Sequence, residues 1–226
     1  MIGLRNRSGR ARRLKMSRAR TLANFVGGTS TIVGNPTFTG TTVGAGKIVQ
    51  IKQTVFKDPF YTSVTTAGHE QVCTGLDCTI TPTSASNKIL VQYAIHMGGT
   101  TFYDNAINIY KNVTATSGAH PLGTKLLDSS GNAIEGNQGA RPASTGVINA
   151  YNGYDDTYKV LPTSLILLDH PNTTSALTYS LAVRSYAYTS VSYIFINRSH
   201  RQQEDTATPK LYDNCPVSTV TLMEVS

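Results

Sequence analysis

The stretch 163–185, TSLILLDHPNTTSALTYSLAVRS, holds the two most regular apolar runs of the chain. The run at 165–168 is continuous, whereas the run at 177–184 alternates large apolar residues with small or polar ones. Because side chains on a strand point alternately to its two faces, the second run predicts a strand with one apolar face. That face holds Leu177, Tyr179, Leu181 and Val183, and the other holds Thr178, Ser180 and Arg184.

Turn chemistry separates the two runs. Asp169, Pro171 and Asn172 lie between them. Asp and Asn side chains hydrogen-bond to nearby backbone, and proline fixes φ, so these residues favour a turn. The stretch therefore predicts two core strands with a tight connection, and the rest of the chain must supply the strands that bury them.

Further strand patterns occur on both sides of this stretch. They are 47–56, 61–66 paired with 69–72, 76–81, 88–97, 106–112, 190–197 and 217–225, the last with Val217, Val220, Leu222 and Val225 as its core residues. We expect Gly98-Gly99 to end the strand at 88–97, and 113–163 and 198–216 to be long polar connections. About eight strands with no convincing helix predict an all-β fold, a jelly-roll-like antiparallel β-sandwich.

The basic residues are concentrated at the N-terminus. Residues 1–57 carry eleven Lys or Arg and no Asp or Glu, although the whole chain has a net charge of only +7. Eight of these residues form a run: Arg5, Arg7, Arg10, Arg12, Arg13, Lys15, Arg18 and Arg20. Such a run can contact phosphates, dock on an acidic protein surface, or serve no specific purpose. No aromatic residue precedes Phe25, so stacking on nucleic-acid bases is not indicated.

Two parts of the chain are expected. Residues 1–45 form a basic N-terminal anchor followed by a Gly/Thr-rich stalk, and 46–226 form the β-sandwich head. The stalk has no apolar face wide enough for a core of its own, so it requires pairing with its own copies or with a host structure. Met16 is an alternative start that would leave only Arg18 and Arg20 of the basic run. No apolar segment follows the basic run and none approaches membrane-spanning length, so neither a secretory signal nor membrane insertion is expected.

Motifs for catalysis or cofactor binding are not found. The chain contains no nucleophile elbow, phosphate-binding loop or dinucleotide fingerprint, and its five His and three Cys do not follow a metal-binding spacing. We expect free thiols, since a Cys73–Cys78 disulfide would need an oxidising compartment. The sequence therefore predicts a protein without catalytic residues, metal or cofactor.

Loop aromatics are the candidate contact residues. They are Phe102, Tyr103, Tyr151, Tyr154, Tyr158, Tyr186 and Tyr188. Large rigid side chains of this kind can stack on sugars or fill a subunit interface. For Tyr186 and Tyr188, near strand ends, burial against a neighbouring subunit is favoured over ligand binding.

Several stretches resemble a known family. These are GKIVQIKQT (46–54), ITPTSASNKILVQ (80–92), LDHPNTTSALTYSLAVRS (168–185) and the terminal STVTLMEVS (218–226). Together they resemble the head domain of phage fibre-like virion proteins of marine and cyanobacterial phages. GNPTFTGTTVGAGK (34–47) is similar to tail-fibre shafts, and MSRARTLANF (16–25) to the start of such proteins. Residues 1–15 and 151–158 lie outside the resemblance.

The resemblance implies a homotrimeric virion protein with a jelly-roll head. Its N-terminal part would bind other virion proteins of the tail or capsid, and its head would bind a host-surface receptor such as a glycan. Nucleic acid is not the expected partner. The alternative is a capsid decoration or tail adaptor protein with a role in assembly. A third possibility, a sugar-processing enzyme on the same scaffold, requires a close carboxylate pair in the folded head.

Overall fold

The structure is a computed structural model of the 226-residue chain. It describes residues 46–64, 69–99, 105–117, 120–136, 144–148, 160–184, 192–199 and 215–226. The chain divides into two units, Met1–Ala45 and Gly46–Ser226, and every described residue belongs to the second. The predicted basic anchor and Gly/Thr-rich stalk lie outside the described residues.

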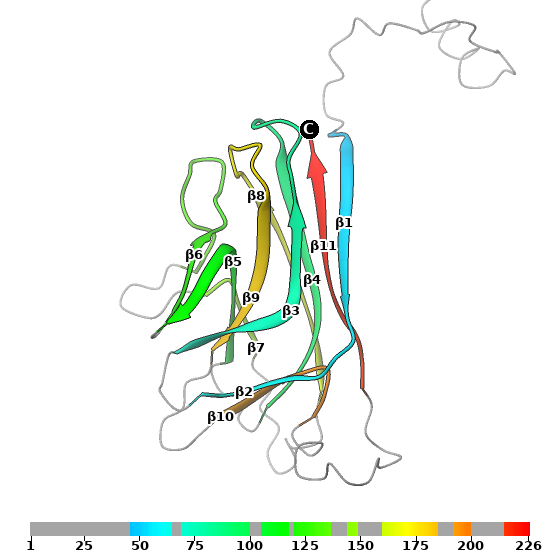
Figure 1. The fold of residues 1–226 in the computed structure, drawn as a ribbon, viewed down its shortest axis with the longest axis vertical. Helices are drawn as coiled ribbons and strands as arrows, with labels where there is room; N and C mark the ends of the chain where they lie inside the picture. Colours follow the sequence, from blue (N-terminus) through cyan, green and yellow to red (C-terminus); the bar gives the residue numbers. More distant parts are fainter. Residues whose placement is uncertain are drawn as a thin grey trace, which may run out of the picture. The chain divides into compact units, whose positions relative to one another are not determined.

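Eleven strands and no helix make up the secondary structure of the described residues (Figure 1). The strands are β1 (Ile48–Phe56), β2 (Phe60–Val64), β3 (Glu70–Ile80), β4 (Lys88–Gly99), β5 (Asn105–Ser117), β6 (His120–Lys125), β7 (Gly146–Ile148), β8 (Leu161–Asp169), β9 (Leu177–Arg184), β10 (Ser192–Ile196) and β11 (Ser218–Val225). The all-β prediction is confirmed.

The strands form two antiparallel sheets. Sheet A has the order β1-β11-β4-β10-β2, and β8 pairs with the other edge of β4. Sheet B has the order β3-β9-β5-β6, with β7 also paired to β5. Along β4, Lys88–Ala94 pair with β11 and Met97–Gly99 pair with β10, so β10 and β11 follow one another on the same edge.

The strand order is that of a jelly roll. Without the short strands β2, β7 and β10, sheet A reads β1-β11-β4-β8 and sheet B reads β3-β9-β5-β6. In chain order these are strands one, eight, three and six in sheet A and two, seven, four and five in sheet B. This arrangement of two interleaved Greek keys defines the jelly roll, so the predicted fold class is confirmed.

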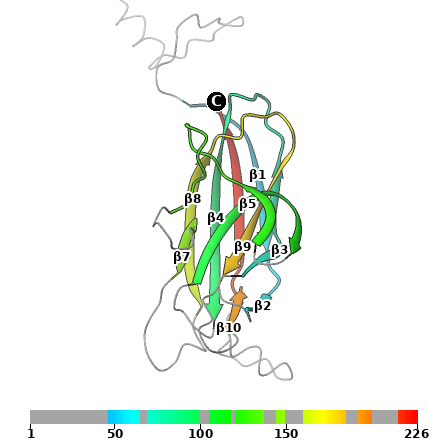
Figure 2. The same ribbon diagram turned by 90° about the vertical axis from the view of Figure 1, so that its left-hand side faces the viewer.

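The two sheets face one another (Figures 1 and 2), and an apolar core lies between them. Sheet A contributes alternate residues of β4 and β11, and sheet B those of β5 and β9, as period-two alternation requires. Leu177, Tyr179, Leu181 and Val183 all belong to this core, which confirms the predicted apolar face of β9.

The prediction of a tight connection between the two central runs was wrong. β8 pairs with β4 in sheet A, whereas β9 pairs with β3 and β5 in sheet B, so residues 170–176 cross between sheets. Within β8, Leu165 and Leu167 pack against the core, but Ile166 is 59% and Leu168 38% exposed. The continuous run is therefore an edge strand with an apolar side chain on both faces, not a doubly buried strand.

The strand pairing expected between 61–66 and 69–72 was also wrong, because β2 pairs with β10 and β3 pairs with β9. The separate strands expected at 69–72 and 76–81 are one strand, β3, with a register shift at its centre. Gly75 lies in this irregularity at φ +94°, and a Cβ there would come within 2.9 Å of the Phe56 ring. Glycine is thus needed both for the backbone angle and for the close approach.

Three boundaries also differ from the predictions. Gly98 and Gly99 do not break the strand after Met97 but form its last two residues, because they pair with Phe195 and Ile194 of β10. The expected connection at 113–163 contains the rest of β5, all of β6 and β7, and the start of β8. Val217 precedes β11 and is 47% exposed, so it is not a core residue, whereas Val220 and Leu222 are fully buried as predicted.

Candidate functional site

The sandwich has two ends with different residues. We call the end at which β1 begins and β11 ends the terminal end, and the opposite one the distal end (Figure 1). At the terminal end the Ser226 amide donates to the Lys47 carbonyl at 3.0 Å, so both ends of this unit lie there. The chain therefore enters this unit, at Gly46, at its terminal end.

Glu224 closes one side of the terminal end. It lies between Gln50 of β1 and Ile89 of β4 in the sheet and is fully buried. Its carboxylate accepts hydrogen bonds from the Thr83 amide and hydroxyl at 2.7 Å each, from Asn87 Nδ2 at 2.7 Å and from Gln50 Nε2 at 2.6 Å. Burial raises the pKa of Glu224, but these hydrogen bonds outweigh it and hold the pKa at about 2.

Asp169 closes the other side of the terminal end. It is fully buried at the end of β8 in sheet A, and its partners belong to sheet B and the segment after β6. Lys111 Nζ lies 3.0 Å from both carboxylate oxygens, Tyr179 Oη donates at 2.7 Å and the Leu127 amide at 2.7 Å. Burial and the nearby Asp169 charge raise the pKa of Tyr179, which therefore stays a donor. This carboxylate joins the two sheets.

These contacts give the resembling stretches a structural role. Gln50 comes from the first stretch, Thr83 and Asn87 from the second, and Glu224 from the last. Asp169 and Tyr179 both belong to the stretch at 168–185. The resembling stretches thus supply the buried polar contacts of the terminal end. Both oxygens of the Asp169 carboxylate and both of the Glu224 carboxylate accept a hydrogen bond from the protein.

The distal end gathers the strand ends that flank the predicted contact segments. Four pairs of residues from neighbouring strands bring these strand ends together. They are Gly99–Ile194, Asn105–Ile148, Glu70–Arg184 and Met97–Leu161. The segments 100–104, 149–159 and 185–191 each connect two of them. All seven predicted aromatics fall in these three segments and lie outside the described residues, as does the whole basic run.

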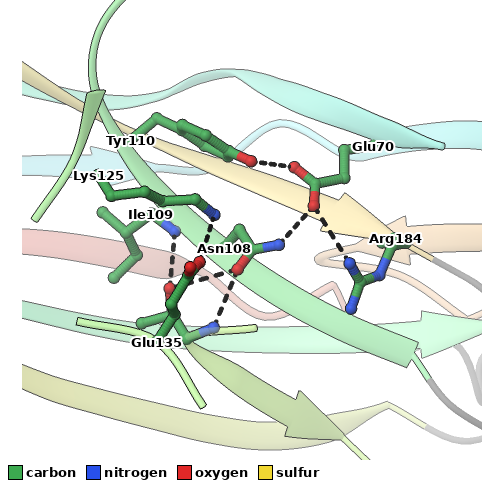
Figure 3. Close-up of polar contacts among 8 residues, drawn as sticks. Glu70, Asn108, Ile109, Tyr110, Lys125, Glu135 and Arg184 are labelled. Atoms are coloured by element: carbon green, nitrogen blue, oxygen red, sulfur yellow. Dashed lines mark hydrogen bonds and ion pairs between the residues drawn. The ribbon is translucent and has the colours of Figure 1, made fainter. Parts of the chain in front are cut away.

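A buried polar cluster on the outer face of sheet B holds two of these strand ends (Figure 3). Glu70, the first residue of β3, accepts hydrogen bonds from Asn108 Nδ2 and Tyr110 Oη at 2.5 Å each. Arg184, the last residue of β9, places Nη1 3.4 Å from Glu70 Oε1. Burial and the hydrogen bond to Glu70 raise the pKa of Tyr110, which keeps its proton for this contact. The cluster fixes the strand ends beside segments 65–68 and 185–191.

Lys125 extends this cluster toward solvent (Figure 3). Its Nζ lies 4.0 Å from the centre of the Tyr110 ring and 3.6 Å from Glu135 Oε2. Burial lowers the pKa of Lys125, although the neighbouring carboxylates of Glu70 and Glu135 oppose that effect. The cluster pairs two acidic side chains with two basic ones, which suits support of the strand ends.

An aromatic surface lies on the outer face of sheet A. Ile194 and Ile196 face the core, so Tyr193 and Phe195 of β10 face outward, next to Tyr61 of β2. The Phe195 ring centre is 6.3 Å from that of Tyr61 and 6.4 Å from that of Tyr193. The Arg198 guanidinium lies 4.8 Å from the Tyr61 ring centre and 5.0 Å from that of Phe195. We call these four residues the distal aromatic patch.

The exposed part of this patch is Tyr61. Its side chain is 55% exposed, whereas Phe195 beneath it is fully buried. Burial lowers the pKa of Arg198. An exposed ring beside a cation can stack on a sugar or pack against a protein. Sequence reasoning missed these residues because it searched loops, although the alternation in 192–196 separates Tyr193 and Phe195 from the core isoleucines.

Asn197 fixes the point where β10 ends and β11 begins. Its side chain is 1% exposed, and its φ is +62°. Nδ2 donates to the Phe56 carbonyl at 2.8 Å and to the Asp58 carbonyl at 3.2 Å, and Oδ1 accepts from Ser218 Oγ at 2.6 Å. One side chain therefore links the end of β1 at Phe56 to the end of β10 and the start of β11 at Ser218.

The buried cysteines and His96 have structural surroundings among the described residues. Cys73 and Cys78 are free and buried, and burial raises the pKa of the Cys73 thiol to about 12, so it is not a nucleophile at neutral pH. His96 is part-buried and its Nδ1 lies 3.0 Å from the Val217 carbonyl. In the described ranges, no group of three or more His, Cys, Asp or Glu is placed to hold a metal ion. The same ranges contain no helix able to cross a membrane.

The sequence matches no protein family and no curated protein. Among solved structures, it is similar to VP2 in the subviral particle of infectious bursal disease virus, with 12% identity over 78% of this chain and 39% of that chain and a TM-score of 0.33. The structure of the Gt strain of the same virus gives 12% identity over 87% and 45% of the two chains, with a TM-score of 0.32. This chain spans less than half of those chains, and likeness at this level bears on neither its family nor its function.

Proposed function

We propose that this chain is a phage virion structural protein without enzymatic activity. It forms a short trimeric fibre that attaches to the particle by residues 1–45 and presents the head, 46–226, to a receptor on the host surface. The proposal rests on the resemblance of the stretches named above together with the polarity of the head.

That polarity is the observation that supports it best. Lys47, near the start of the head, bonds to Ser226 at the terminal end, so the chain that carries the eight clustered cations enters the head there. The strand ends that flank the seven candidate aromatics gather at the distal end. A head anchored at one end leaves the other end free to meet a partner, which is the arrangement that an attachment protein requires.

The buried carboxylates favour a binding role over catalysis. Each buried carboxylate has its own set of hydrogen-bond donors or cations. The three are Glu70, Asp169 and Glu224. Glu70 lies on the outer face of sheet B, whereas Asp169 and Glu224 lie between the sheets with different donors, which is not the arrangement of the acid pair that glycoside hydrolysis uses.

Adsorption of phage particles tests the proposal. Replacing Tyr151, Tyr154 and Tyr158 together by Ala should slow adsorption to the host several-fold, while the amount of this chain in each particle stays unchanged. Leu122→Ala, at a 56% exposed residue of β6, is the matched control. Unchanged adsorption by the triple variant would contradict receptor attachment through that segment.

The basic run favours a second candidate, a capsid decoration or tail adaptor protein. Eight cations within twenty residues suit docking on an acidic virion surface. In that case, deletion of residues 1–20 abolishes incorporation, and adsorption by assembled particles depends on no residue of the head. The two experiments together separate the candidates.

A further inference from the structure

The cations that burial affects differ in how their charge is balanced. Three of them each lie at ion-pair distance from a carboxylate. These pairs are Lys111–Asp169 at 3.0 Å, Arg184–Glu70 at 3.4 Å and Lys125–Glu135 at 3.6 Å. Arg198 of the distal aromatic patch differs, because no carboxylate of the described residues forms an ion pair with it.

The surroundings of Arg198 leave its guanidinium only partly satisfied. The Tyr61 and Phe195 rings lie 4.8 Å and 5.0 Å from it, and its Nε is buried without a hydrogen-bond acceptor among the described residues. The charge interactions that act on it come from Tyr61 and Cys215, and neither is a carboxylate. A partly buried cation is costly without an anionic partner, so an acidic group of a ligand would stabilise this site.

The rings of the patch form a rigid platform beside this cation. The Phe195 ring is inclined by 25° to the Tyr61 ring and by 23° to the Tyr193 ring, so the three rings are nearly parallel. Phe195 is fully buried and supports Tyr61, which is its direct partner across the β2–β10 pair. A ring held in this way loses little conformational freedom when a ligand stacks on it.

The size of the open surface suits a small ring rather than a protein. Tyr61 is 55% exposed, which for an aromatic side chain is on the order of 100 Å². A standard protein interface takes roughly 800 Å² from each partner. A single cation also falls short of the several phosphate contacts on which nucleic-acid binding depends. One sugar ring with one acidic group matches both the area and the charge.

We propose that the distal aromatic patch binds a sugar that carries a carboxylate group. The sugar ring stacks on the exposed part of Tyr61, and its carboxylate pairs with the Arg198 guanidinium, which has no such partner among the described residues. The inference rests on the receptor attachment of the proposed function. It names the chemistry of the contact and places it on a strand face at the distal end (Figure 1).

Saturation-transfer NMR with the full chain tests the inference. The probes are methyl glucuronide and methyl galacturonide, and the neutral controls are methyl glucoside and methyl galactoside, which lack only the carboxylate. At least one acidic sugar should bind more strongly than its neutral counterpart, with saturation transferred mainly to its ring protons. Equal binding of acidic and neutral sugars, or no binding of either acidic sugar, overturns the inference.

Variants of the patch locate the binding site. Arg198→Gln should weaken binding of the acidic sugar about tenfold, because it removes the charged hydrogen-bond donor, and should leave the neutral sugar unaffected. Tyr61→Ala should weaken both several-fold, whereas Tyr61→Phe keeps the ring and should weaken neither. Lys88→Gln is the matched control, since it removes one charge from an exposed residue at the terminal end. Binding of the acidic sugar that survives Arg198→Gln excludes this site, and thermal unfolding checks that each variant is folded.

Adsorption of particles that carry Arg198→Gln or Tyr61→Ala separates this inference from the proposed function. Slower adsorption by both variants supports the two together. If the triple tyrosine variant adsorbs slowly and these two do not, receptor attachment stands and this site is excluded. If the acidic sugar binds the patch but no variant slows adsorption, the sugar site stands and the proposed function fails. Adsorption that resists periodate treatment of the host cells but is abolished by protease indicates a protein partner and overturns the sugar.

Discussion

The two ends of the sandwich use polar residues differently. At the terminal end, Asp169 and Glu224 are fully buried between the sheets, and donors from distant strands surround each carboxylate. At the distal end, Glu70 lies on the outer face of sheet B, and the aromatic ring of Tyr61 on sheet A stays 55% exposed. The terminal end is closed, whereas the distal end presents side chains beside the segments that the sequence marks as contact residues.

Because of this difference, substitutions at the terminal end should lower stability, whereas substitutions at the distal end should affect binding. A buried carboxylate with several donors loses much when it is removed, because the donors are left without partners. An exposed aromatic residue loses little on truncation. The four predictions below compare the two ends, from the largest expected effect to the smallest.

Asp169→Ala should have the largest effect. It leaves Lys111, whose side chain is 5% exposed, as a buried cation without its carboxylate. We expect a loss of about 3–5 kcal/mol in the free energy of unfolding, measured by chemical denaturation. The double variant Lys111→Met with Asp169→Leu should lose less than the single one. A single variant within 1 kcal/mol of the unaltered chain would contradict the structural role of Asp169.

Asn197→Ala should cost about 2–4 kcal/mol by the same measurement, because it removes buried hydrogen bonds and places Ala at a positive φ. Asn172 is the matched control, since its φ is +51° but its side chain is exposed. Asn172→Ala should cost about 1 kcal/mol, the strain alone. Equal losses in both variants would show that the contacts to Phe56, Asp58 and Ser218 contribute nothing.

Glu224 should make stability depend on acid pH. Its pKa is about 2 in the folded chain and 4.5 ordinarily, so the unfolded chain takes up a proton first as pH falls. The stabilisation is complete above about pH 5 and declines as pH falls toward 2. Glu224→Gln should cost about 1–2 kcal/mol at neutral pH and flatten this decline, measured by denaturation at several pH values. An unchanged profile would assign the decline to other carboxylates.

Arg198→Ala should have the smallest effect, about 0.5–1 kcal/mol, because it removes a cation from two ring faces at the partly exposed distal aromatic patch. Arg198→Lys should recover only part of this loss, since a lysine lacks the planar group that stacks on rings. Thermal unfolding measures both. A loss above 2 kcal/mol would make Arg198 a structural residue comparable with Asn197.

The strands and their core faces were largely predictable. The alternation in 177–184 identified the buried face of β9, and 47–56, 88–97 and 217–225 were placed close to β1, β4 and β11. Period-two alternation is a local property of the chain, which is why it can be read without the fold. The prediction that Gly98-Gly99 would break the strand was wrong. Glycine can adopt extended backbone angles, so it continues a strand where a neighbouring strand, here β10, pairs with it.

The candidate site was predicted less well. The seven loop aromatics and the basic run lie outside the described residues, so those predictions stand untested. Tyr61, Tyr193 and Phe195 were missed because they lie on strands, where an aromatic residue is usually assigned to the core. Only the pairing of β2 with β10 brings Tyr61 onto Phe195.

The sequence by itself determined the all-β class, the sandwich, the apolar face of β9 and the concentration of basic residues in the first twenty positions. The tertiary structure alone decided that β8 and β9 belong to different sheets, that one face of β8 is exposed, and that Glu224 meets Asn87 and Thr83. The physical reason is distance along the chain: alternation is set by adjacent residues, whereas Thr83 and Asn87 lie 141 and 137 residues from Glu224.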